Sequence, residues 1–245
     1  MSFLSHFRPA DTPYRVVQKR ARNQHFHGRM SLSCLLAAAS HGCASLLTYL
    51  LAWHLVYLKK EGWVELNKSA CGVAGLSERR RQTAVRRLAN HTQLLQIQRR
   101  CGLPPLVSPV DLWPDDVYFL GHMSWECLKR AAAAQPNGAS LAVYLIAWHE
   151  YNLVRRQSPV RLGQSQRERL GLKRSAWNRA INQLLRAELL HICAQRPGSS
   201  PIVLPLDPWR PYPSDTATPL LGPAELDQPR PVLPLVFATT RAPAG

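Results

Sequence analysis

The sequence predicts a mainly α-helical protein with small β-hairpins, built as two tandem domains that arose by internal duplication. Residues 45–54, "SLLTYLLAWH", agree with residues 140–149, "SLAVYLIAWH", at seven of ten positions. In each copy, apolar residues recur at helical spacing, and two alternating runs follow around a Gly/Pro turn. The net charge is +16, and residues 26–110 and 117–206 each carry +8 of it.

Matching residues extend the duplication over about 90 positions. The offset between equivalent residues is 93 at Phe26/Phe119, 95 through the "AWH" segment and 96 from Val64/Val160 to Leu88/Leu184. Each change of offset falls in a predicted turn. The chain is therefore expected to comprise a basic N-terminal arm (1–25), domain 1 (26–110), an acidic linker (111–116), domain 2 (117–206) and a Pro-rich tail (207–245).

Both copies predict the same order of elements. Serine is a favoured N-cap, so helices are expected at Ser31–Ala39 and Ser124–Ala134, followed by long apolar helices at Ala44–Lys59 and Ala139–Val154. The pieces "WVEL" and "PVRL" alternate as strands do, and a terminal hairpin follows in each copy. The remaining predicted helices are Lys68–Val73, Ser77–Asn90, Ser165–Arg169 and Arg174–Ala187.

Several functional classes find no support in the sequence. The start has no apolar core of a secretion signal, and the longest apolar run, Leu46–Leu58, is shorter than the ~20 residues of a membrane span. The six cysteines form no CxxC pair, and Cys34 and Cys127 are expected in the core of a protein in a reducing compartment. No Walker loop, GxSxG or HExxH motif is present. We expect a cytoplasmic, nucleoid-associated protein without enzymatic activity, metal or cofactor.

The segment Gly171–Leu190, "GLKRSAWNRAINQLLRAELL", resembles the winged helix-turn-helix family, including the MarR-like regulators. Gly171 and Leu172 match the turn, Trp177, Ile181 and Leu184 match the core positions, and Arg179 matches the usual arginine. Glu188 departs from the glycine common in the closing "AGLI". The first copy, "GLSERRRQTAVRRLANHTQLL", keeps Gly75, Leu76, Val85 and Leu88 but has Arg81 at a core position. The tandem arrangement is similar to that of plasmid replication initiators.

This resemblance implies a helix that enters the major groove of double-stranded DNA while basic groups contact phosphates. The amides of Gln82 and Asn178, which are equivalent, are suited to pair with adenine. The candidate contacts on the helix of copy one are Ser77, Arg79, Arg80, Gln82, Thr83 and Arg86, with Arg99 and Arg100 on its hairpin. Those of copy two are Lys173, Arg174, Ser175, Asn178, Arg179, Asn182 and Arg186, with Arg196 on its hairpin.

Several alternatives stay open at this stage. A transcriptional regulator and a replication initiator fit equally well, and a third hypothesis is a non-catalytic subunit of a nucleoprotein assembly that binds RNA or protein. Trp53/Trp148 and His54/His149 are expected to pack in the core, with the histidines hydrogen-bonded, because no repeated acidic residue or cysteine accompanies them. The Pro-rich tail is expected to be a disordered linker, or else a strap that docks a partner protein.

Overall fold

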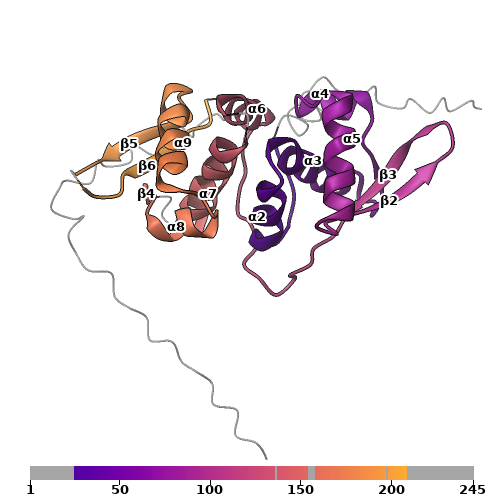
Figure 1. Cartoon of the computed structure of the whole chain (residues 1–245), viewed down its shortest axis with the longest axis horizontal. Coiled ribbons are helices and arrows are strands. Elements are labelled where there is room, and N and C mark those ends of the chain that lie inside the picture. Colours follow the sequence, from indigo (N-terminus) through magenta and orange to yellow (C-terminus); the bar gives the residue numbers. More distant parts are fainter. Residues whose placement is uncertain (1–24, 136, 154–157, 197, 209–245) are drawn as a thin grey trace, which may run out of the picture. The chain divides into compact units, whose positions relative to one another are not determined.

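The computed structural model describes residues 25–135, 137–153, 158–196 and 198–208. In these residues the fold is mixed α/β, with eight helices and two antiparallel three-stranded sheets (Figure 1). The predicted helical content and the small hairpins are confirmed. Residues 1–24 of the predicted arm and the predicted tail beyond Pro208 lie outside the described residues.

The two halves of the described chain have the same order of elements. The first half contains α2 (Leu32–Ser40), α3 (Cys43–Lys59), β1 (Val64–Glu65), α4 (Lys68–Val73), α5 (Glu78–Asn90), β2 (Leu95–Arg100) and β3 (Leu103–Pro109). The second half contains α6 (Trp125–Ala134), α7 (Ala139–Leu153), β4 (Val160–Arg161), α8 (Gln164–Arg169), α9 (Arg174–Arg186), β5 (Leu190–Ala194) and β6 (Ile202–Pro205).

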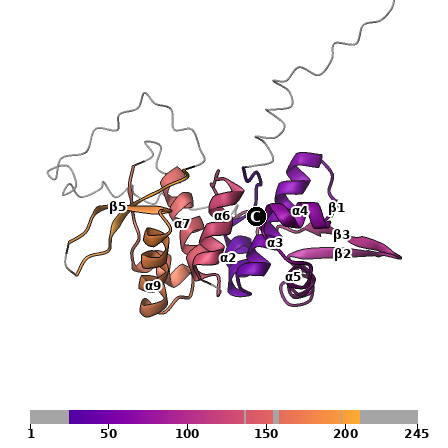
Figure 2. The ribbon, with the colours of Figure 1, turned by 90° about the horizontal axis from the view of Figure 1, so that it is seen from above.

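Each sheet is a hairpin to which a two-residue strand is added. The strand orders are β1-β3-β2 and β4-β6-β5, with Val64 opposite Val107 and Val160 opposite Val203. Figure 2 shows β2 and β3 side by side as an extended hairpin. A register shift interrupts both hairpins, between Gln98 and Arg100 in one and between Ile192 and Ala194 in the other.

Local chemistry explains where the helices begin and turn. Ser31 and Ser124 cap α2 and α6, as predicted. Their hydroxyl oxygens accept hydrogen bonds from the N–H groups of Cys34 and Cys127, respectively. Gly75 and Gly171 precede α5 and α9 with φ of +65° and +61°, a conformation that glycine adopts without a steric penalty. Glu188 also has a positive φ of 56°, so the turn after α9 keeps its left-handed backbone without glycine.

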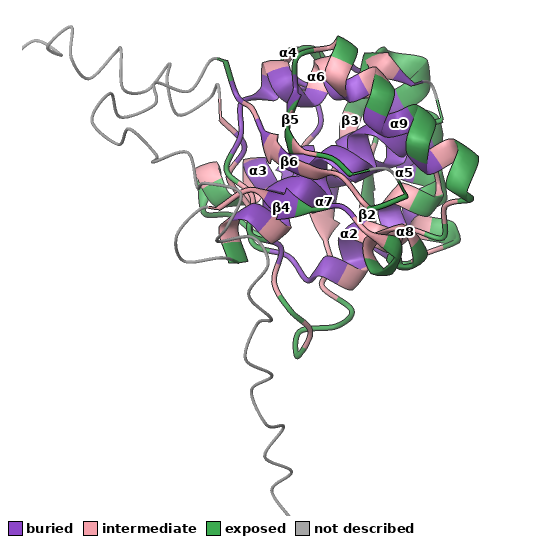
Figure 3. Ribbon diagram, turned by 90° about the vertical axis from the view of Figure 1, so that its left-hand side faces the viewer, coloured by how far each residue is buried: buried purple, intermediate pink, exposed green. Residues whose placement is uncertain are grey.

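The long helices α3 and α7 form the centre of each half, and Figure 3 shows them largely buried. Trp148 is 1% exposed, as the sequence predicts, whereas Trp53 is only half-buried. The Nδ1 atom of His54 accepts a hydrogen bond from the N–H of His27, and that of His149 accepts one from Leu120, each at 3.1 Å. The predicted role of these histidines as hydrogen-bonded core residues is therefore confirmed.

A polar cluster, buried in the second half and partly buried in the first, joins the end of each hairpin to the start of the first helix of that half. In the second half, Asp207 accepts hydrogen bonds from the N–H of Ser124 at 2.7 Å and from the thiol of Cys127 at 3.2 Å. Asp111 makes the equivalent bonds to the N–H of Ser31 and the thiol of Cys34, at 3.1 and 3.4 Å. Residues assigned by sequence to the linker and the tail therefore complete the two folded halves.

The segments that precede α2 and α6 pair reciprocally with each other. The N–H of Phe26 donates to the carbonyl of Met123, and the N–H of Phe119 donates to the carbonyl of Met30, at 2.7 and 2.8 Å. Phe26 and Phe119, which are equivalent, also contact each other, with ring centroids 6.3 Å apart. The buried residues of both halves form one continuous hydrophobic cluster. Each half thus stabilises the other.

Candidate nucleic-acid interface

The helices α5 and α9 are equivalent in position, and each has 13 residues. The buried face of α9 is apolar, as predicted for Trp177, Ile181 and Leu184, whereas the buried face of α5 also contains Arg81. Each helix lies beside the first strand of the adjacent hairpin, and Figure 1 shows α5 next to the β2–β3 hairpin. The structure therefore presents one helix face and one hairpin together in each half.

Nearly all predicted contact residues are exposed on these elements. Those on α5 and at its N-cap are Ser77, Arg79, Arg80, Gln82, Thr83 and Arg86. Those on α9 and at its N-cap are Lys173, Arg174, Ser175, Asn178, Arg179, Asn182 and Arg186. Arg99 in β2 and Arg196 just after β5 are also exposed.

Arg100 differs from the other predicted contacts because the hairpin itself engages its guanidinium. Nη2 of Arg100 lies 2.8 Å from Oε2 of Glu65, and it donates to the carbonyl of Pro104 at 2.6 Å. The Arg100 side chain is about three-quarters buried. This ion pair therefore joins β1 to the hairpin, and among the guanidinium nitrogens only Nη1 has no hydrogen-bond partner in the described residues.

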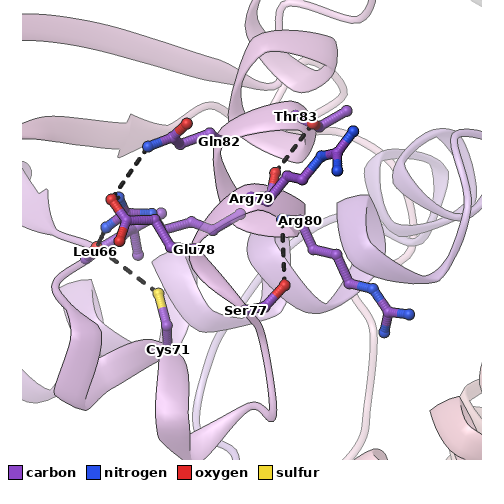
Figure 4. A network of polar contacts seen from close by, with 9 residues as sticks. Leu66, Cys71, Ser77, Glu78, Arg79, Arg80, Gln82 and Thr83 are labelled. Atoms are coloured by element: carbon purple, nitrogen blue, oxygen red, sulfur yellow. Dashed lines mark hydrogen bonds and ion pairs between the residues drawn. The ribbon is translucent and has the colours of Figure 1, made fainter.

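A network of side chains occupies the first turns of α5 (Figure 4). Arg81, which the sequence shows at a core position, turns inward, and its guanidinium donates to the carbonyl of Leu66 and lies 3.5 Å from the Glu78 carboxylate. Gln82 donates to the same carboxylate at 3.2 Å. Burial raises the pKa of the Cys71 thiol, which stays protonated and donates to the carbonyl of Leu66. The space beneath α5 is thus filled by the chain itself.

The equivalent region of the second half is an open polar cleft of about 570 Å³ between α8, α9 and the β5–β6 hairpin. Trp177 replaces Arg81 and Arg174 replaces Glu78, so both the inward guanidinium and the carboxylate are missing here. Within the described residues, Arg174, Asn178 and Asn182 line the cleft and have no side-chain hydrogen bond or ion pair. Exposed side-chain donors and acceptors of α9 therefore line an open, polar cleft.

One basic residue of this cleft was not predicted from the sequence. Arg167 on α8 lines it, and its exposed partner Glu168 is 3.8 Å away. The available signal was the alignment of the two halves, in which Arg167 is equivalent to Cys71 while Trp177 is equivalent to Arg81. The inward arginine of the first half is therefore on α5, whereas the arginine that lines the cleft of the second half is on α8.

Comparisons with protein-family models, with curated proteins and with solved structures found no match. Within the described ranges, no helix is long and apolar enough to cross a membrane. In the same residues, no group of three or more His, Cys, Asp or Glu side chains is arranged to hold a metal ion.

Proposed function

We propose that this chain is a sequence-specific protein for double-stranded DNA, built from two winged helix-turn-helix domains that arose by duplication. In this proposal, α5 and α9 are the recognition helices and the β2–β3 and β5–β6 hairpins are the wings. Because the exposed residues of the two helices differ, their preferred half-sites differ and the target is not a palindrome. Within this function, a transcriptional regulator and a replication initiator are equally supported.

The observation that carries the proposal is the repeated placement of an exposed basic helix beside a hairpin. A helix of this size fits the major groove, where base edges distinguish all four base pairs. Phosphate contacts from surrounding arginines then set its position and orientation. The charge of +8 in each half supplies the electrostatic attraction that such binding requires.

The experiment is selection of binding sites from random duplex DNA with the full chain, repeated at two salt concentrations. An enriched bipartite, non-palindromic motif with a steep loss of affinity at higher salt is the expected result. Salt-sensitive binding without any motif would instead favour the alternative, a subunit of a nucleoprotein assembly that binds RNA or protein. Absence of duplex binding at low salt would refute the proposal outright.

A further inference from the structure

The exposed polar side chains of α5 are engaged within their own helix. The amide of Gln82 donates to Glu78, and the hydroxyl of Thr83 donates to the carbonyl of Arg79 at 3.0 Å. The hydroxyl oxygen of Ser77 accepts the N–H of Arg80 at the N-cap, at 3.5 Å. Three of the predicted contacts in the first half therefore already have partners before any base edge is offered to them.

The charge on the first turn differs between the two helices. The Glu78 side chain is 72% exposed and stands where α9 has Arg174. A carboxylate at this position repels phosphates and the acceptor atoms of guanine and adenine, whereas an arginine attracts them. What remains available on α5 is a set of cations, and Figure 4 shows the guanidinium groups of Arg79 and Arg80 directed away from the Glu78 carboxylate.

The helix α9 has the opposite arrangement. Asn178 and Asn182 are exposed, line the cleft and keep both amide donors and the carbonyl acceptor unpaired within the described residues. An amide of this kind pairs with adenine through two hydrogen bonds. Arg179 on the same helix is exposed and has no acidic partner in the described part of the chain.

We propose that base-specific recognition is concentrated in the second half, on α9 and its cleft, while the first half binds mainly the phosphate backbone. This inference rests on the proposed function, and it makes the selected motif asymmetric. One half-site should be strongly specified by Asn178 and Asn182. The other should be the weakly specified part of the bipartite motif and contribute mainly salt-dependent affinity.

The test compares matched variants of equivalent residues in the full chain, using the selected duplex and a scrambled duplex of equal length. Asn178→Ala should lower the ratio of specific to non-specific affinity roughly fivefold or more, since a bidentate base contact is lost. Gln82→Ala, at the equivalent position, should change that ratio less than about twofold, because its amide is held by Glu78. Circular dichroism checks that both variants stay folded.

A third variant measures the backbone role of the first half. Arg86→Ala should weaken binding to both duplexes equally. It should also make the plot of log affinity against log salt less steep, by the amount expected for about one lost phosphate contact. Equal loss of specificity in Gln82→Ala and Asn178→Ala would overturn the inference, as would a change of the preferred bases in Arg86→Ala. These outcomes leave the proposed function intact. A wild-type chain that binds no duplex, or binds without a motif, would overturn both proposals.

Discussion

The two buried histidines predict that the fold loses stability in mild acid. His54 and His149 are 3% and 0% exposed, and burial lowers the pKa of each from 6.5 to about 4. The charge of the nearby His27 contributes to the lowered pKa of His54, and that of Arg169 to the lowered pKa of His149. Protonation would also turn each Nδ1 atom into a donor, so it could no longer accept the hydrogen bond from the backbone N–H group that faces it.

The direction and the size of this loss of stability follow from the difference in histidine pKa between the folded and the unfolded chain. Between pH 6.5 and 4 the unfolded chain binds protons that the folded chain excludes, so stability falls as pH falls through this window. At pH 5 the loss is about 2 kcal/mol for each histidine, and about 4 kcal/mol for both, relative to pH 8. The groups packed against His54 include Phe26, His27 and Trp125, and His149 stacks on Phe119.

The assay is urea unfolding of the full chain, followed by far-ultraviolet circular dichroism at pH 8, 6 and 5. The matched control is the double variant His54→Asn/His149→Asn, in which the amide oxygen can replace Nδ1 as an acceptor but cannot titrate. This variant should be less stable at pH 8, because it leaves cavities, yet it should lose much less stability between pH 8 and pH 5. An acid loss equal to that of the wild type would refute the assignment of the two histidines.

Five further substitutions test the packing of the core, the polar clusters, the turn after α9 and the proposed recognition helix. Trp148→Ala should cost about 3–5 kcal/mol of folding free energy, measured as a lowered melting temperature and urea midpoint; an unchanged melting temperature would contradict burial. Asp207→Asn should cost about 1–3 kcal/mol in the same assay, and more than Asp111→Asn, because Asp207 is fully buried and Asp111 is not. Glu188→Gly should stabilise the chain by up to about 1 kcal/mol by relieving a left-handed φ, and a destabilised variant would show that the turn is not strained. Arg179→Ala should weaken specific DNA binding by about 1–3 kcal/mol in a fluorescence-anisotropy titration without changing the melting temperature, and wild-type affinity would argue against α9 as the recognition helix.

The elements of this fold were predictable because their signals are local in the chain. Helical spacing and the capping serines gave the helices, and alternation around a Gly/Pro turn gave the hairpins. The partners of the buried polar groups were not predictable in the same way. His149 bonds a residue 29 positions away, and Asp207 bonds Ser124 at 83 positions. An isolated aspartate before a Pro-rich segment has the sequence pattern of a tail, and only the folded chain supplies its donors.

The candidate site shows the same limit. Periodicity predicted which side chains of α5 and α9 are exposed, because that depends on one helix alone. The availability of those side chains depends on neighbours, and the neighbours differ between the halves. The sequence showed Arg81 at a core position, but its turn toward the carbonyl of Leu66 and its approach to Glu78 depend on the fold around β1. Arg167 entered the site from α8, an element the sequence did not connect with binding.

The pattern of agreement between the halves bears on why two copies are useful. The contacts that hold each half together are repeated. In both halves a histidine on the long helix accepts a backbone hydrogen bond, and an aspartate after the hairpin bonds the N-cap serine of the first helix. Differences between the halves occur on the exposed faces of α5 and α9, where Glu78 corresponds to Arg174. Under the proposed function, two identical faces would favour a symmetric target, whereas unequal faces in one chain should favour an asymmetric one. Under that proposal, a single chain would recognise an asymmetric site without assembling two different subunits.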